Sequence, residues 1–173
     1  ASYGSPRMLC QIKITYDDGS EDTIISDTSW KVRNSPVVFN DEYLGEIFDA
    51  RECDREWQDV VERKAPTGEL CASYAPLDKI MEIISPVSFR RTDEGWEADF
   101  GKEISGWLRF RDVNGKSGDI LTVKYISESP VGEQKYIFGD GKCEDYAPKF
   151  TWYVFRKAII SGVELSEDNV TAE

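Results

Sequence analysis

The sequence predicts an all-β protein, an antiparallel β-sandwich of the jelly-roll type with at most one short helix. Three observations favour this fold class. Apolar and polar residues alternate with a period of two in several short stretches. Turns rich in Gly, Asn, Asp and Pro separate these stretches at intervals of roughly eight to twelve residues, as in sandwiches and barrels. A helical period occurs in one stretch only.

The first strand pair is predicted near the N-terminus. Residues 10–16 place apolar side chains on one face and polar side chains on the other. Residues 17–20, Asp-Asp-Gly-Ser, supply the chemistry of a tight turn, and apolar residues resume at 23–25. The pattern therefore predicts a β-hairpin.

Two further hairpins are predicted in the second half of the chain. Residues 87–100 alternate on both sides of a turn at 93–95. Residues 104–125 keep the same period on both sides of Asn114-Gly115, a dipeptide that favours two-residue hairpin loops.

The last strong segment, residues 150–161, carries apolar side chains on both faces. A strand covered on both faces lies inside a sheet, so this segment is predicted to be a central strand. Residues 54–64 instead place apolar side chains at helical spacing, with Asp54 as a predicted N-cap. They predict the one short helix.

The domain organisation is predicted to be simple. Residues 1–162 are expected to form a single β-sandwich domain without internal repeats. Residues 163–173 are polar and acidic, and are expected to form a tail or the start of a linker. The longest apolar stretches are far shorter than the roughly 20 residues of a membrane-spanning helix, so no membrane insertion is expected.

Composition excludes several classes of function. The 173 residues carry 33 acidic and 21 basic side chains, a net charge of −12. This charge repels phosphate backbones, so nucleic acid is not an expected partner. The chain has no histidine, which excludes imidazole-based triads, histidine zinc sites and histidine acid–base catalysis. Any acid–base chemistry would fall to carboxylates.

The four cysteines, Cys10, Cys53, Cys71 and Cys143, form no C-x-x-C pair. The sequence therefore contains neither a zinc-ribbon motif nor a thioredoxin-like redox motif. Reduced thiols are the simplest interpretation, and one or two disulfides are the alternative for an exported protein.

One acidic stretch is the best candidate for a cation or sugar site. Amide and carboxylate oxygens lie close together in the sequence at Asn40, Asp41, Glu42, Glu46 and Asp49, and calcium takes about six to eight oxygen ligands. A sugar also presents an apolar C–H face that packs on aromatic rings. Trp57, beside a predicted loop and charged neighbours, is the predicted stacking surface.

Four phrases of the chain, in order, resemble the accessory β-sandwich region of bacterial α-L-rhamnosidases, the inverting enzymes of glycoside hydrolase family 78. Residues 18–31, with DGS and then DTSWK, resemble the opening phrase of that region. Residues 45–51, GEIFDAR, resemble its GE-x-YDAR phrase, the most specific of the four. Residues 99–107, DFGKEISGW, and residues 146–156, YAPKFTWYVFR, resemble the two later phrases.

The chain departs from the family pattern at two of these places. Lys102-Glu103 stands where Gln-Asn is usual, and Tyr153-Val154 stands where His-Gly is typical. The catalytic (α/α)₆ barrel of the family has no counterpart here. The resemblance therefore implies that this chain alone is not an enzyme.

In the resembling family, one such sandwich binds L-rhamnose through calcium, with an Asp-Asn pair just before the GE phrase. Here the pair reads Asn40-Asp41, in the reverse order. The resemblance implies a calcium ion held by Asn40, Asp41 and Glu46, with Asp49 behind them and L-rhamnose completing the coordination. The alternative is that the carboxylates are solvated and that Asp49 pairs with Arg51 to hold the loop.

The sequence is compatible with three functions. The first is a non-catalytic accessory domain, a carbohydrate-binding module that packs beside the catalytic barrel of its parent chain and binds rhamnose-containing glycan. The second is the same sandwich as a purely structural scaffold with no ligand. The third is a small free-standing glycosidase, which needs two carboxyl groups roughly 5 to 10 Å apart. The resemblance also implies polysaccharide degradation and a periplasmic or secreted location.

Overall fold

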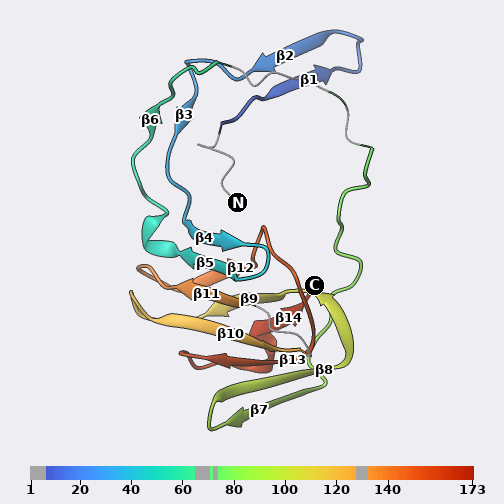
Figure 1. Cartoon of the computed structure of the whole chain (residues 1–173), viewed down its shortest axis with the longest axis vertical. Helices are drawn as coiled ribbons and strands as arrows, with labels where there is room; N and C mark the ends of the chain where they lie inside the picture. The colour runs from blue at the N-terminus through green and yellow to red at the C-terminus, as the bar shows by residue number, and fades with distance from the viewer. Residues whose placement is uncertain (1–6, 65–70, 72–73, 128–131) are drawn as a thin grey trace. The chain divides into compact units, whose positions relative to one another are not determined.

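The computed structural model divides the chain into two compact units (Figure 1). The structure describes residues 7–64, 71, 74–127 and 132–173. The first unit comprises Ala1–Asn34 and Arg55–Tyr74, and the second comprises Ser35–Asp54 and Ala75–Glu173. The region expected to be one domain, residues 1–162, therefore contributes to both units.

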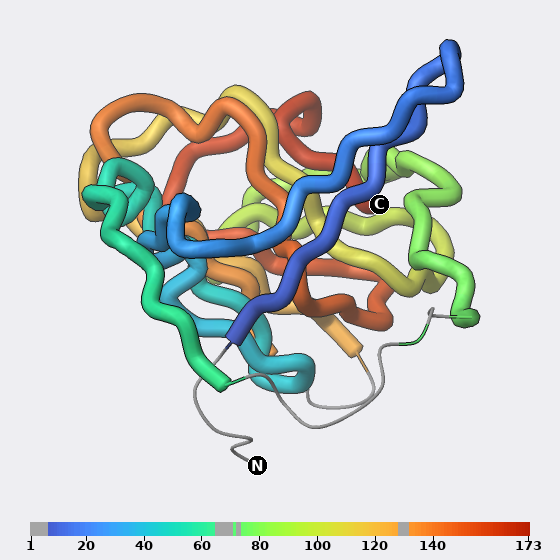
Figure 2. The backbone as a smooth tube through the Cα atoms, turned by 90° about the horizontal axis from the view of Figure 1, so that it is seen from above, coloured from blue at the N-terminus to red at the C-terminus, as the bar shows by residue number. Residues whose placement is uncertain are grey.

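The first unit contains two antiparallel strand pairs. Its strands are β1 (Gln11–Thr15), β2 (Glu21–Ile25), β3 (Lys31–Val32) and β6 (Gln58–Asp59). β1 and β2 run side by side as the predicted N-terminal hairpin (Figure 2), and β3 pairs with β6. The Asp18 carboxylate closes the hairpin turn by accepting the N–H of Ser20 at 2.9 Å, and Gly19 supplies the positive φ of +82°.

The helix predicted over residues 54–64 does not form, and that prediction is wrong. This described stretch contains no helix, and its one regular element is β6. Trp57 and Val61, which share the apolar spacing, are 60% and 66% exposed. Helical spacing stabilises a short helix only when the apolar stripe is buried against a core, and here it is not.

The second unit is a β-sandwich of two sheets. The larger sheet has the order β4-β5-β11-β10-β13-β8-β7, and the smaller has the order β12-β9-β14. The strands are β4 (Val37–Asp41), β5 (Gly45–Asp49), β7 (Ser88–Thr92), β8 (Gly95–Gly106), β9 (Leu108–Val113), β10 (Ile120–Ile126), β11 (Glu133–Ile137), β12 (Cys143–Tyr146), β13 (Tyr153–Ser161) and β14 (Val170–Ala172). The predicted all-β fold class is confirmed.

Helical structure in the described part of the chain is limited to two 3₁₀ turns, η1 (Ala50–Glu52) and η2 (Glu167–Asn169). Within the same residues, no helix is long and apolar enough to cross a membrane.

The large sheet is antiparallel except at one pair. β5 and β11 run parallel, with Glu46 beside Gln134. β7 and β8 form the hairpin predicted within residues 87–100. β13 lies between β10 and β8, as the apolar pattern of residues 150–161 predicted, although the strand begins only at Tyr153.

Both sheets contribute to a common core that contains a buried polar clamp. The largest fully buried rings are Phe100, Phe110, Phe138 and Phe155. The Tyr125 hydroxyl on β10 donates to the Gln134 side-chain oxygen and accepts the N–H of Leu108 on β9 at 2.9 Å. The Gln134 amide donates to the Leu108 carbonyl at 3.0 Å. The clamp satisfies these buried polar groups and ties the two sheets together.

The third predicted hairpin does not form. β9 pairs with β12 and β14 in the small sheet, whereas β10 pairs with β11 and β13 in the large one. Asn114-Gly115 therefore carries the chain from one sheet to the other, and a Cβ at Gly115 would lie 2.6 Å from the Phe138 ring. Two strands facing one core from opposite sheets show the same alternation as a hairpin, so the pattern alone could not separate them.

Residues 163–173, expected to be an acidic tail or linker, belong to the sandwich. They include η2 and β14, and β14 pairs with β9. Val170 and Ala172 are 1% and 0% exposed. The expectation is wrong because β14, with these two inward-facing residues, completes the small sheet. The many acidic residues around them made the segment look like a solvated tail in the sequence.

Candidate functional site

The four predicted oxygen ligands, Asn40, Asp41, Glu46 and Asp49, lie on the β4–β5 hairpin. Asn40 is exposed at the end of β4, opposite Glu46 on β5. Asp41 closes the turn, because its Oδ1 accepts the N–H groups of Tyr43 and Leu44, each at 2.9 Å. These two hydrogen bonds hold the pKa of the Asp41 carboxyl below its usual range. The carboxylate thus already has a structural role in the turn.

Glu46 is completely buried. Its carboxylate accepts the N–H of Lys149 at 2.9 Å and the hydroxyl of Tyr146 at 3.4 Å. A calcium ion held jointly with Asn40 and Asp41 would require this carboxylate to exchange those partners. Among the described residues, no three acidic or cysteine side chains gather in a form that could hold a metal ion.

Asp49 is 6% exposed and forms a bidentate ion pair with Arg51. The Arg51 Nε and terminal nitrogen donate to its two oxygens at 2.8 and 2.7 Å. The N–H of Arg51 also donates to Asp49, which caps η1. The guanidinium holds the pKa of the Asp49 carboxyl below its usual range. The ion pair weighed as the alternative is the arrangement that the structure shows.

Trp57 belongs to the first unit, whereas the four oxygen-bearing candidates belong to the second. The Arg33 guanidinium lies over the Trp57 ring, 4.5 Å from its centroid. This cation covers part of the ring surface that a sugar would use. The stacking role of Trp57 stays a prediction.

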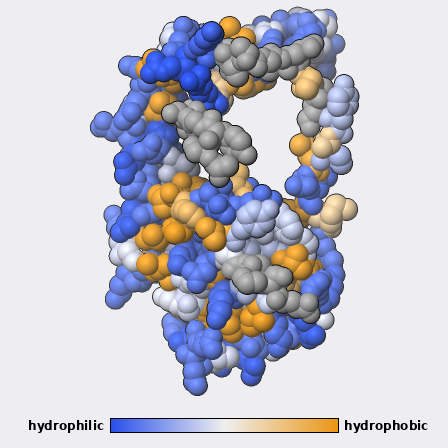
Figure 3. Space-filling view, viewed as in Figure 1, coloured by the Kyte–Doolittle hydropathy of each residue, from blue (hydrophilic) through white to orange (hydrophobic). Residues whose placement is uncertain are grey.

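Exposed aromatic side chains lie near the β4–β5 turn within the second unit. Tyr43 on the turn is 78% exposed, and Phe150 and Trp152 are 63% and 53% exposed. The Thr151 hydroxyl donates to the Glu42 carbonyl at 3.4 Å, which places this segment against the turn. Figure 3 shows hydrophobic residues gathered over β4 and β5. The sequence offered no signal for this surface, because the same residues fit a buried strand.

The two later family-like phrases meet each other in the large sheet. Arg156 on β13 donates through Nε to Asp99 on β8 at 2.9 Å. The rings of Phe100 and Phe155 pack edge to face with centroids 5.9 Å apart. The Arg156 guanidinium and the N–H of Gly101 lower the pKa of Asp99 to about 2. Arg156 therefore forms an ion pair within the sheet.

Acid should weaken the sandwich partly through Asp99. Its folded-state pKa of about 2 lies below the ordinary value of about 4, so the unfolded chain takes up the proton first as the pH falls. The stabilisation is complete above about pH 4 and is lost as the pH approaches 2. Chemical unfolding of wild type and Asp99→Asn across this window should give midpoints that converge at the acid end. A constant gap between them would contradict this.

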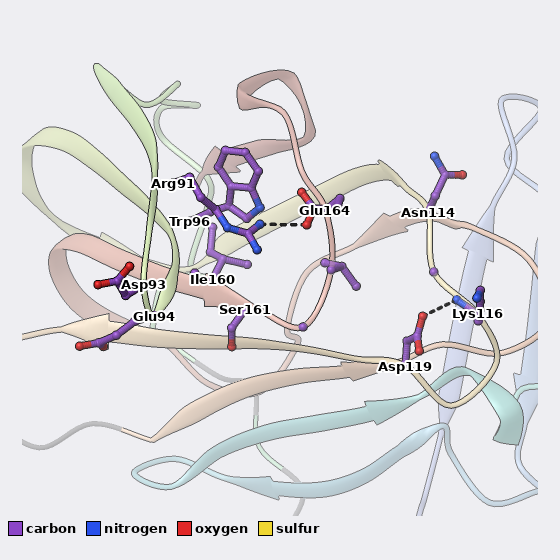
Figure 4. A pocket seen from close by; sticks show the side chains of 14 residues that line it. Arg91, Asp93, Glu94, Trp96, Asn114, Lys116, Asp119, Ile160, Ser161 and Glu164 are labelled. Atoms are coloured by element: carbon purple, nitrogen blue, oxygen red, sulfur yellow. Dashed lines mark hydrogen bonds and ion pairs between the residues drawn. The ribbon is translucent and has the colours of Figure 1, made fainter.

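A separate cavity of about 720 Å³ opens between three connections of the second unit (Figure 4). Its walls are the β7–β8 turn, the β9–β10 connection and the end of β13. The Arg91 guanidinium lies 5.0 Å from the Trp96 ring centroid and donates to Glu164 at 3.0 Å. The residues that line this cavity come from three turns that are distant in sequence, so no linear pattern marks it.

The second unit is an all-β sandwich in which residues of the second, third and fourth phrases contact one another. Residues 1–82 match the family described as the α-L-rhamnosidase N-terminal domain. This part of the chain is therefore similar to the N-terminal domain of α-L-rhamnosidases, the family that the four phrases resemble.

The matching relatives are much longer proteins. An α-L-rhamnosidase from Formosa agariphila is 29% identical over 96% of this chain and 20% of its own length. An α-L-rhamnosidase from Streptomyces avermitilis is 26% identical over 92% of this chain and 18% of its own length. The chain thus spans about a fifth of these relatives.

Solved rhamnosidase structures share the fold. The Streptomyces avermitilis enzyme, crystallised with L-rhamnose, superposes with a TM-score of 0.79 at 24% identity, over 95% of this chain and 19% of that one. The Dictyoglumus thermophilum enzyme gives a TM-score of 0.75 at 25% identity, over 94% of this chain and 21% of that one.

Proposed function

We propose that this chain is a non-catalytic accessory domain of an α-L-rhamnosidase, and that its first role is to provide a stable sandwich beside the rest of the enzyme. The observation that carries the proposal is the use of the phrase residues. Glu46 of the second phrase binds the N–H of Lys149 in the fourth, and Asp99 of the third binds Arg156 in the fourth. Residues of the family-like phrases thus form contacts with one another inside the sandwich.

The acidic residues also argue against hydrolysis by this chain. The buried acids in the described part of the chain are Glu46, Asp49 and Asp99, and each accepts internal hydrogen bonds. A glycosidase needs one carboxylic acid with a raised pKa beside a second, ionised carboxylate. Asp49 and Asp99 are shifted in the opposite direction, toward a lowered pKa.

We expect the purified chain to release no aryl alcohol from aryl α-L-rhamnosides. The measurement is a long incubation followed by absorbance, with a full-length α-L-rhamnosidase as the positive control. Turnover that survives repeated purification and is abolished by one Asp or Glu substitution would support the free-standing glycosidase instead.

A second candidate function is binding of rhamnose-containing glycan with calcium at the β4–β5 turn. Asn40 is exposed there, and Tyr43, Phe150 and Trp152 offer exposed aromatic faces within the same unit. A similar fold occurs in a rhamnosidase crystallised with L-rhamnose. Calcium would take the Asn40 amide and Asp41 carboxylate, with Glu46 joining only after leaving its internal partners.

Titration calorimetry with L-rhamnose, with calcium and with EDTA, tests this candidate. Asp41→Asn keeps the oxygen that accepts the turn N–H groups but removes the negative charge, so it should lose calcium-dependent binding while the fold survives. Asp18→Asn is the matched control, because Asp18 closes the β1–β2 turn in the same way. If wild type shows no heat at millimolar sugar and calcium, the scaffold role stands alone.

A further inference from the structure

The connection between β9 and β10 contains an asparagine that is followed by glycine, Asn114-Gly115. The other three asparagines of the sequence precede serine, aspartate and valine. In an asparagine–glycine pair the glycine nitrogen can reach the side-chain carbonyl carbon of the asparagine, because glycine has no side chain that obstructs the approach. Ring closure between the two residues is therefore least hindered at Asn114.

Both reacting groups of this pair are free in the part of the chain that the structure describes. Asn114 is exposed and lies outside the strands, between the end of β9 at Val113 and the start of β10 at Ile120. No described residue accepts the Gly115 N–H or shares a hydrogen bond with the Asn114 amide. Figure 4 shows the Asn114 side chain directed away from Lys116 and Asp119. Ring closure thus breaks no hydrogen bond among these residues.

Asn169 provides the opposite case within the same unit. Its Oδ1 accepts the N–H of Ser166 at 2.9 Å, and its amide nitrogen donates to the Arg111 carbonyl at 2.9 Å. The next residue, Val170, is β-branched, 1% exposed and paired with Phe110 in the small sheet. Ring closure at Asn169 would break these contacts, so Asn169 serves as an internal unreactive control.

We propose that Asn114 is a site of spontaneous deamidation in the folded protein. Hydroxide removes the proton of the Gly115 nitrogen, and this nitrogen forms a bond to the Asn114 Cγ. The bond from Cγ to the side-chain nitrogen breaks, water supplies the proton with which ammonia leaves, and hydroxide is regenerated. The product is a cyclic imide that joins the two residues.

Water then opens the imide at one of its two carbonyl carbons. Attack at Cγ breaks the new bond to nitrogen and leaves aspartate in an unchanged main chain. Attack at the main-chain carbonyl carbon breaks the original peptide bond and leaves isoaspartate, in which the main chain passes through Cγ. Both products replace an NH group of the asparagine by oxygen.

Isoaspartate would disturb the packing beneath this connection. It lengthens the main chain by one carbon atom next to Gly115, where a Cβ would already lie 2.6 Å from the Phe138 ring. Phe138 is fully buried, so the ring has little room to move away. We therefore expect the isoaspartate form to unfold at a lower urea concentration than the unmodified protein.

Aspartate, the other product, changes the charge but not the course of the main chain. The cavity beside Asn114 is lined by more carboxylates than cations: Asp93, Glu94, Asp119 and Glu164 against Arg91 and Lys116. A further carboxylate at exposed Asn114 is repelled weakly, because solvent screens it. The aspartate form should thus stay close to the unmodified protein in stability.

Mass spectrometry of digested protein tests the reaction after incubation in mildly alkaline buffer, with and without unfolding urea. The peptide that contains Asn114 should gain the mass of the NH-to-O exchange in the folded sample, several-fold faster than the peptide that contains Asn169. The rate should rise with pH, because the attacking nitrogen must first lose its proton. The readout involves neither sugar nor enzyme activity, so the result is independent of the function proposed above.

Two variants separate the modification from its consequences. Asn114→Gln keeps an amide but closes a larger ring slowly, so it should lose the mass gain at this position. Methyl transfer by a protein isoaspartate methyltransferase should label aged wild type and much less of aged Asn114→Gln. In urea unfolding, aged wild type should show a lowered midpoint, whereas aged Asn114→Gln and fresh Asn114→Asp should unfold near fresh wild type.

Three outcomes would overturn the proposal. The first is a mass gain at Asn114 in the urea sample but none in the folded sample. The second is methyl transfer that is undiminished in Asn114→Gln, which would assign the isoaspartate to the aspartate–glycine pairs Asp18-Gly19 or Asp140-Gly141. The third is an unchanged urea midpoint in wild type that contains measured isoaspartate at Asn114, which would show that the packing against Phe138 tolerates the longer main chain.

Discussion

Replacing Phe155 by alanine is expected to lower the free energy of unfolding of the second unit by about 3–5 kcal/mol. Phe155 is 1% exposed on the interior strand β13. Its ring packs against Tyr125 and Phe100, with centroid distances of 4.6 and 5.9 Å. The variant leaves a cavity between these rings and removes their aromatic contacts.

Urea unfolding followed by circular dichroism measures this loss. Phe150→Ala is the matched control, because Phe150 is 63% exposed and its replacement should change stability by about 0.5 kcal/mol or less. If the two variants unfold at the same urea concentration, the described core is not the one that stabilises the protein.

Replacing Glu46 by alanine is expected to cost about 2–4 kcal/mol. The side chain is completely buried, and its loss leaves the Lys149 N–H and the Tyr146 hydroxyl without their acceptor. The same change removes a contact between two parts of the chain that are far apart in sequence. The measurement is again the midpoint of urea unfolding.

Two variants separate this role of Glu46 from a general charge effect. Glu46→Gln retains an acceptor oxygen and should cost less than Glu46→Ala. Glu133→Gln removes a half-exposed carboxylate whose partner is Lys135, and should have little effect. A Glu46→Ala protein as stable as wild type would show that the carboxylate is not a structural acceptor, and would leave it available for calcium.

Strands were predictable from sequence where one face is buried or a turn is short. The β1–β2 and β7–β8 hairpins and the interior position of β13 follow from alternation and turn chemistry. The sheet assignment of β9 and β10 does not, because alternation reports the side that faces the core and not the neighbouring strand. β14 was missed because its two buried residues, Val170 and Ala172, are too few to form a pattern.

The candidate site was less predictable than the fold. The sequence places Asn40, Asp41, Glu46 and Asp49 close together, and the structure keeps them around one hairpin. It offered the Asp49–Arg51 ion pair as an alternative, because the two residues are close in sequence. It could not show that the Glu46 carboxylate accepts an internal hydrogen bond, because the donor is the N–H of the distant Lys149. The cavity at Trp96 is assembled from three turns and has no linear signature.

The parallel pairing of β5 with β11 has a consequence for how the protein is made. A ribosome releases β4 and β5 long before β11, so the hairpin first has an open edge with unpaired backbone groups. The Glu46 carboxylate likewise has no Lys149 N–H to accept until residue 149 is synthesised. One edge of β9 stays unpaired until β14, at the end of the described chain, is synthesised. Pairings so distant in sequence make folding slow and expose intermediates to aggregation. The small sheet can therefore be completed only after the C-terminal strand β14 has been synthesised.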